Sequence, residues 1–213
     1  QQNKLMKQKL LHSVRLRAAM LVAVMCAAFA GTAWADDTTI TWAVSGVTTA
    51  ASGGSNVNTT LKTSSITGGS GTWTAVASTS YAGTSLGAQF GSSSYTFAGT
   101  LTLSDSSIPS TATIKSIGIT LSSSGTAYKI DAKVGDTAFG SQVSVNQKDS
   151  KTYTFTGSME GNAIQLSFSS GGTKNVIITQ ISVTYSATPA TPFTVTFSDG
   201  GSVQNESGLY LGL

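Results

Sequence analysis

Short runs in which apolar and polar residues alternate recur along the chain from Asp36 onward, and they limit its fold more than any other feature. In Thr39–Val44 the side chains of Ile40, Trp42 and Val44 fall on one face of an extended strand. Clusters of Gly, Ser, Asn and Asp separate the runs, and no stretch keeps a helical period. This spacing predicts an all-β protein, a two-sheet antiparallel sandwich.

The same alternation predicts the strands and the core of the sandwich. About nine or ten strands are expected between Thr38 and Tyr185. Apolar residues on one face of each strand would form the core without disulfides. Besides the first run, the expected inward-facing residues are Leu86, Ala88, Phe90, Tyr95, Phe97, Leu101, Leu103, Ile117, Ile119, Leu121, Tyr128, Ile130, Ala132, Val134, Tyr153, Phe155, Ile164, Leu166, Phe168, Ile177, Ile181, Val183 and Tyr185.

Residues 6–35 have the three parts of a secretory signal peptide: a basic start, an apolar run and an Ala-x-Ala site. Ala33 and Ala35 form the site, with cleavage before Asp36. The apolar run is shorter than the roughly 20 residues that a membrane-spanning helix needs, so membrane contact is expected only through this transient leader. Residues 1–5 are interpreted as upstream or fragment residues. The mature protein is expected in the periplasm, at the cell surface or outside the cell.

Removal of the leader reverses the sign of the net charge. The whole chain has 12 Lys and Arg against 9 Asp and Glu, a formal charge of +3. Five of the basic residues, including both arginines, precede Asp36, whereas none of the nine acids does, which leaves seven lysines and a net charge of −2. Phosphate binding needs a concentrated basic surface, usually with arginine. Nucleic acid is therefore excluded as a partner.

The residues that most enzyme sites require are missing from the mature chain. The single histidine, His12, and the single cysteine, Cys26, both lie in the leader. This excludes a Ser-His-Asp or Cys-His nucleophile, a zinc site of His and Cys ligands, and disulfides. No motif for a cofactor is present, so none is expected.

Carboxylates are the remaining route to catalysis, because glycosidases need only two suitably spaced acids. Alternation places Asp131 on an outward face between Lys129 and Lys133, as part of a solvated row of charges. Asp105, Asp136 and Asp149 lie in turn-like contexts, where a structural role is the default. The remaining candidate acids are Glu160 and, at the new N-terminus, Asp36 and Asp37.

The chain after the alternating run that ends at Tyr185 divides into a linker and the start of another strand segment. We assign residues 36–187 to the sandwich module and residues 188–192, which contain two prolines, to a stiff linker. Residues 193–213 start with another alternating run, Phe193–Phe197, and a Ser-Asp-Gly-Gly turn follows. This segment is interpreted as the truncated start of a second β-domain.

Three segments resemble, in order, a β-sandwich module of secreted multidomain proteins from gut Gram-negative bacteria. They read YAGTSLGAQFGSSS, ATIKSIGITLSSSGTAYKIDAKVGDTAFG and KTYTFTGSMEGNAIQLSFSSGGTKNVIITQISVTYS, and together they cover about Tyr81 to Ser186. The resemblance implies an accessory domain of jelly-roll or carbohydrate-binding type, without defined binding residues. The triplets beginning at Asp37 and Asp136 also resemble the O-glycosylation motif of such bacteria, with Thr38 and Thr137 as acceptors; chance triplets in a Thr-rich chain are the alternative.

Exposed aromatic rings are the usual contacts for sugars, although aromatic residues more often fill cores. Trp42 alternates with Ile40 and is assigned to the core. Trp73 follows a glycine-rich loop and could be either a sugar platform or a core plug, with the plug slightly favoured. Tyr81, in a loop-like segment, could assist a platform.

Three functions remain open. The first is a non-catalytic accessory module that binds a polysaccharide or surface glycan, followed by further domains of the same chain. The second is a structural or adhesive spacer without a ligand of its own, which the bland Thr and Ser surface favours. The third and least favoured is a hydrolase that uses only carboxylates.

Overall fold

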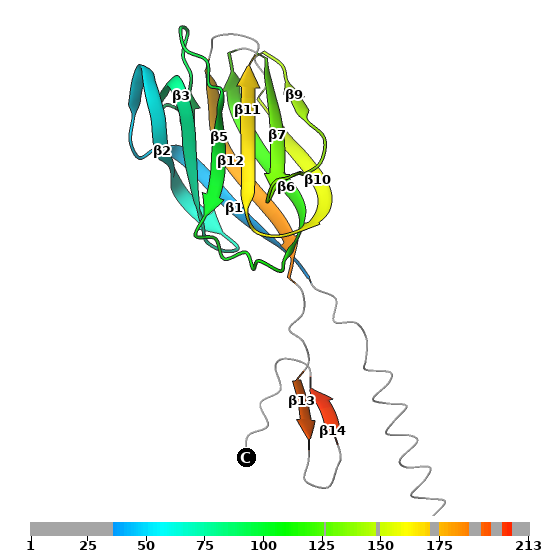
Figure 1. The fold of residues 1–213 in the computed structure, drawn as a ribbon. Helices are drawn as coiled ribbons and strands as arrows, with labels where there is room; N and C mark the ends of the chain where they lie inside the picture. The colour runs from blue at the N-terminus through cyan, green and yellow to red at the C-terminus, as the bar shows by residue number, and fades with distance from the viewer. Residues whose placement is uncertain are drawn as a thin grey trace, which may run out of the picture. The chain divides into compact units, whose positions relative to one another are not determined.

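The computed structural model describes residues 36–125, 127–147, 150–170, 175–187, 193–196 and 202–205 (Figure 1). These residues form strands and connecting turns, with no helix among them, so the described protein is all-β. The strands are β1 (Asp37–Val47), β2 (Ala51–Thr67), β3 (Thr72–Thr84), β4 (Ala88–Phe90), β5 (Gly99–Ser104), β6 (Thr113–Ser124), β7 (Tyr128–Val134), β8 (Thr137–Ala138), β9 (Val143–Val145), β10 (Thr152–Glu160), β11 (Ile164–Ser170), β12 (Val176–Ser186), β13 (Phe193–Thr196) and β14 (Ser202–Asn205).

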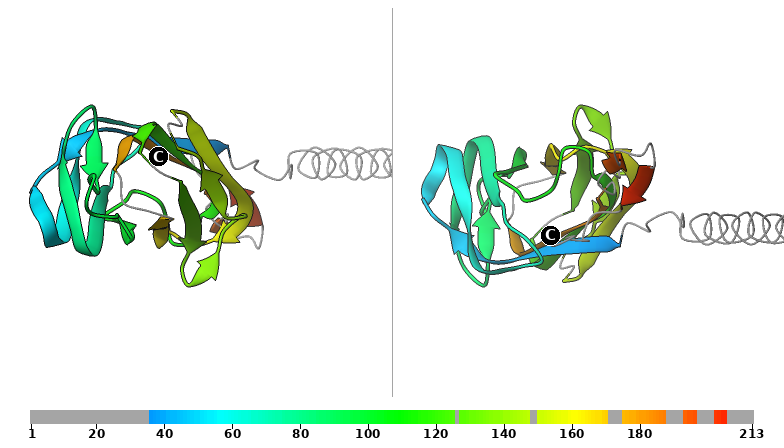
Figure 2. Two further views of the ribbon diagram at one scale, coloured as in Figure 1. Left: turned by 90° about the horizontal axis from the view of Figure 1, so that it is seen from above. Right: turned by 90° about the horizontal axis from the view of Figure 1, so that it is seen from below.

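Twelve of these strands belong to one antiparallel sheet. Its order is β10-β6-β12-β1-β2-β3-β5-β11-β7-β8, while β4 pairs with β12 and β3, and β9 pairs with β7. Figure 1 shows β5, β11 and β7 in front of β12, β1 and β6, and the views along the strands in Figure 2 show the sheet curving round between these two halves. The side chains between the halves form one hydrophobic core.

Strand β2 joins the two halves, and its length follows from this role. Its residues Leu61 to Thr67 pair with β1, whereas its residues Ala51 to Thr60 pair with β3, with register shifts along both ladders. Only Val57, Thr59 and Leu61 are buried along its 17 residues. The polar, glycine-containing sequence of β2 gave no strand signal, because pairing on both sides rather than alternation holds it extended.

The twelve strands exceed the nine or ten that the sequence predicted. The difference comes from β2 and from the short strands β8 and β9, of two and three residues. Strands this short carry too few alternating positions to be recognised in a sequence.

Alternation predicted most of the core correctly. Ile40 and Trp42 of β1 are fully buried, as are Ile117 and Ile119 of β6 and Ile130 of β7. Aromatic rings from three segments meet in the core: the rings of Phe90 and Phe97 stack with centroids 4.5 Å apart, and the Phe97 and Phe168 centroids are 5.4 Å apart.

Three positions differ from the predicted core. Tyr95 is only partly buried and lies outside the core cluster, in the loop before β5. Leu86 lies in the turn before β4 and is 81% exposed, because the strand begins only at Ala88. In β12, register shifts on both sides of Ile178 change which residues face inward. Ile178 therefore belongs to the core, whereas Ile177 is buried but lies outside the core cluster. A bulge of this kind moves one residue to the opposite face.

The first and last strands of the sheet lie side by side. β1 pairs with β12 from Asp37↔Ser186 to Ala43↔Gln180. Hydroxyl pairs connect neighbouring strands on the outer face, with 2.9 Å between Oγ1 of Thr39 and Oγ1 of Thr184, and 2.8 Å between Oγ1 of Thr120 and Oγ1 of Thr152. The chain therefore enters and leaves the twelve-stranded sheet at one end.

The segments outside this sheet are described only in part. β13 and β14 pair as a two-stranded antiparallel sheet, in the segment predicted to begin a second domain. The predicted leader (6–35), its site residues Ala33 and Ala35, and the linker (188–192) lie outside the described residues. None of the described residues forms a helix with the length and hydropathy needed to cross a membrane.

Candidate functional site

Trp73 is a core residue and not a sugar platform. Its side chain is 1% exposed, and its ring packs edge-to-face on Trp42, with centroids 5.7 Å apart and an interplanar angle of 88°. Trp73 pairs with Leu103 of β5, and the small residue Ala75 follows on the same buried face. A ring enclosed in this way cannot stack on a ligand, so the plug interpretation is the one that the burial supports.

The glycine-rich loop before Trp73 serves the core as well. The indole Nε1 of Trp42 donates a hydrogen bond of 2.9 Å to the carbonyl oxygen of Gly71. Gly68 has φ of +79°, and a Cβ atom there would collide with the backbone oxygen of Thr39. The loop needs glycine because it lies directly against β1.

Tyr81 lies within β3 rather than in a loop, and its side chain is partly exposed. Its hydroxyl covers Gly83 of the same strand, where a Cβ atom would meet the phenol. The structure therefore does not combine Trp73 and Tyr81 into one platform, since the first is buried in the core and the second lies outside the core cluster.

The described carboxylates have structural surroundings. Asp131 accepts hydrogen bonds of 3.1 and 2.9 Å from Nε2 of Gln142 on its two carboxylate oxygens. Asp105 has φ of +49°, a backbone conformation that suits the turn residues Asp and Asn. Asp136 follows Gly135 in the two-residue turn between β7 and β8. Glu160 ends β10, and Asp149 lies outside the described residues.

No group of three or more His, Cys, Asp or Glu that could hold a metal ion occurs within the described part of the chain.

The two predicted glycosylation acceptors differ in accessibility. Thr137 is exposed beside the tight turn between β7 and β8. Thr38 is partly buried in β1 and pairs with Tyr185 of β12. Asp36, the first residue after the predicted cleavage site, is exposed. Modification at either threonine stays a prediction.

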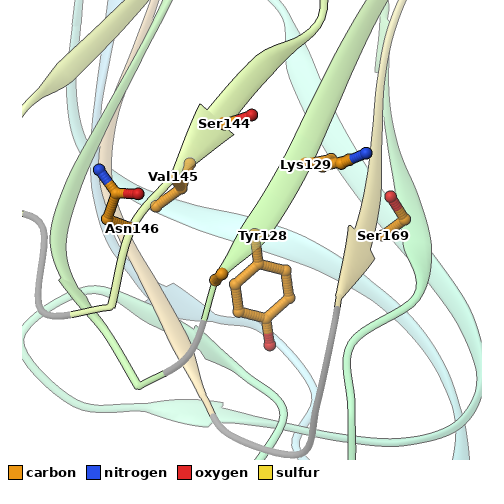
Figure 3. Close-up of a pocket in the computed structure, with 7 residues that line it drawn as sticks. Tyr128, Lys129, Ser144, Val145, Asn146 and Ser169 are labelled. Carbon is orange, nitrogen blue, oxygen red and sulfur yellow. The ribbon is translucent and has the colours of Figure 1, made fainter.

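A hollow of about 360 Å³ lies where β7, β9 and β11 approach the same end of the sheet (Figure 3). It contains an aromatic ring, one lysine, two serine hydroxyls and one carboxamide. The residues that line it are Ala127, Tyr128, Lys129, Ser144, Val145, Asn146 and Ser169.

The strand registers explain why these residues meet. Lys129 of β7 lies opposite Ser144 of β9 on one side and Ser169 of β11 on the other. Since side chains alternate across a strand, these three exposed residues share the outer face. Tyr128 pairs with Val145, and both are buried on the inner face. The lining of the hollow therefore combines the exposed row of Ser144, Lys129 and Ser169 with buried residues at the edge of the core.

The charge of the hollow comes from Lys129. None of the seven lining residues is acidic. The side chain of Lys129 has no hydrogen bond or ion pair with any other described residue, and the carboxylate of Asp131, two residues along the strand, binds Gln142. The hollow offers hydrogen-bond donors and acceptors from three strands, which are the groups that orient a ligand in a pocket.

Sequence reasoning missed this site. Tyr128 was correctly assigned to the core, and Lys129 was assigned to a solvated row of charges. Ser144, Asn146 and Ser169 come from separate segments without a motif. Only the pairing of β9 and β11 with β7 brings them together. A search for exposed polar residues adjacent to a buried aromatic residue in one strand would have selected the Tyr128–Lys129 pair.

Comparison with known proteins gave no match: no protein-family model, curated protein or solved structure is significantly similar to this chain. The candidate site is therefore judged by its own geometry.

Proposed function

We propose that this chain is a non-catalytic, glycan-binding accessory module of an exported multidomain protein, and that the hollow between β7, β9 and β11 holds the sugar. The observation that carries the proposal is the lining of the hollow. Hydroxyl, carboxamide and ammonium groups line a volume of about 360 Å³, while the ring of Tyr128 is buried in the core beneath them. Hydrogen-bonding groups of these kinds are the ones that orient a polar ligand such as a sugar in a pocket.

The fold proposed for the module is a jelly-roll-like sandwich, with the two facing halves of the curved sheet as its layers. This agrees with the resemblance to secreted modules of gut Gram-negative bacteria. Asp37 and Ser186 are paired, so such a module can stand in a longer chain with little disturbance to its neighbours. Export through the leader and a final position in the periplasm, at the surface or outside the cell belong to the same proposal.

Affinity electrophoresis of the purified chain in gels containing soluble plant, microbial or animal polysaccharides tests the proposal. We expect at least one polysaccharide to retard the chain, and the double variant Lys129→Ala/Asn146→Ala to lose most of the retardation. The matched control is Lys133→Ala/Asn58→Ala, which removes the same exposed residue types from β7 and β2, outside the hollow. Retardation that both double variants retain equally would reject the hollow as the site.

The spacer function is the second candidate, and the hydroxyl-covered outer face favours it. The Thr39–Thr184 and Thr120–Thr152 pairs make that face polar and uncharged between neighbouring strands. A spacer predicts that no polysaccharide retards the chain. Turnover of a polysaccharide that is lost on mutation of two acids would instead support the carboxylate-only hydrolase.

A further inference from the structure

We propose that the hollow recognises an acidic group on a sugar, a carboxylate or a sulfate ester, and that the ammonium group of Lys129 binds it. This inference rests on the proposed glycan-binding function and adds the chemical class of the ligand.

The position of Lys129 is the first argument. The residue lies in the middle of a row across three strands, with Ser144 and Ser169 as its direct cross-strand neighbours, and Figure 3 shows it between them. Cross-strand neighbours on one face have side chains close enough to act together. Two hydroxyls beside one ammonium provide a charged donor flanked by neutral donors, which is the arrangement that an anionic oxygen group prefers.

The electrostatic surroundings are the second argument. No acid occurs among the described residues that line the hollow, and the ammonium group of Lys129 has no ion pair with a described carboxylate. The nearest acid along the strand, Asp131, has both carboxylate oxygens bound to the Gln142 amide. Lys133 lies beyond it on the same exposed face. Among the described lining residues Lys129 is the one charged group, in a chain whose net charge from Asp36 onward is −2.

The size of the hollow is the third argument. A volume of about 360 Å³ is near the lower end of ligand pockets. It holds about one or two sugar rings rather than a long stretch of chain. An acidic terminal residue of a glycan, or a single acidic residue presented from a chain, fits this space.

Isothermal titration of the purified chain with four oligosaccharides of equal length tests the inference. The probes are an oligogalacturonate, its fully methyl-esterified form and a sulfated neutral oligosaccharide with its unsulfated parent as reference. We expect at least one acidic probe to bind about tenfold more tightly than its uncharged counterpart, because one charged hydrogen bond is gained. Which acidic probe binds distinguishes a carboxylate ligand from a sulfate ligand.

The variants assign the effect to one residue. Lys129→Gln should remove the preference for the acidic probe, and Lys133→Gln, with an equal change of charge on the same face of β7, should retain it. Added salt should weaken binding of the acidic probe and leave the uncharged counterpart unaffected. Equal binding of acidic and uncharged probes, or an equal effect of both variants, would overturn the inference and leave glycan binding standing. Absence of binding to every glycan would overturn the proposed function as well.

Discussion

At the scale of single residues, the two tryptophans in contact show how one residue type can have different energetic roles. Both Trp42 and Trp73 are buried, and their rings touch edge-to-face. Trp42 has a hydrogen-bond partner in the carbonyl oxygen of Gly71, whereas the buried Nε1 of Trp73 has none among the described residues. Burial of a polar group without a partner is costly, so Trp73 contributes packing alone.

Substitution by phenylalanine should distinguish the two residues. Trp42→Phe removes part of the packing and a buried hydrogen bond, whereas Trp73→Phe removes similar packing and an unpartnered N–H group. We expect Trp42→Phe to lower the free energy of unfolding by about 1 kcal/mol more than Trp73→Phe. Urea unfolding followed by fluorescence of the remaining tryptophans measures both. Equal destabilisation, or a larger loss for Trp73→Phe, would contradict the assigned hydrogen bond.

The sequence predicted individual residues well where a strand alternates regularly. Ile40, Trp42, Ile117 and Ile119 needed only the two-residue period to be placed in the core, because a strand buried on one face allows no other arrangement. It left the role of Trp73 open, since its surroundings of Gly, Ser, Thr and Ala fit a loop platform as well as a core position. Trp73 could be assigned to the core only from its contacts with Leu103 and Trp42, which belong to other strands.

At the scale of strands, β12 shows why alternation fails at a bulge. The strand pairs with β1, β4 and β6, and its register changes on both sides of Ile178. Thr179, between the two parts of the strand, uses its hydroxyl to bind the carbonyl oxygen of Thr120. Counting in twos from Tyr185 therefore selected Ile177 for the core, where the structure places Ile178.

Alanine substitutions on either side of this bulge should differ in their effect. Ile178→Ala empties a fully buried core position and should cost about 2–5 kcal/mol of folding free energy. Ile177→Ala removes a side chain outside the core cluster and should cost less, about 1–2 kcal/mol. Chemical denaturation of the two variants provides the comparison. A greater loss for Ile177→Ala would show that the regular alternation, rather than the bulge, describes this strand.

Elements of low hydrophobicity were the least predictable. β2 contains only three buried side chains in 17 residues, so no pattern distinguishes it from a loop. The candidate site was equally hard to predict from the sequence, because only strand pairing places Ser144 and Ser169 next to Lys129. Neither the pairing partner nor the register is encoded in a local stretch of polar residues.

At the scale of the whole described module, one core supports a surface composed mainly of hydroxyl groups. The core runs through strands from both halves of the sheet, and β2 and β4 connect the halves through hydrogen bonds. Strand pairing holds side chains from β7, β9 and β11 next to one another in the proposed site, and a preorganised site loses less entropy on binding. We therefore propose that one end of the sheet carries the function, while the core that runs through both halves provides the stability.

The most direct test of the account is to locate the bound sugar by NMR. The isotope-labelled chain would be titrated with a soluble oligosaccharide released from the polysaccharide that retards it in affinity gels. We predict that the largest amide shifts will occur at residues 127–129, 144–146 and 169, which line the hollow. Shifts centred on Tyr81 or on the outer face of β1 and β12, or no shifts with any oligosaccharide, would contradict the central claim that this hollow is a glycan site.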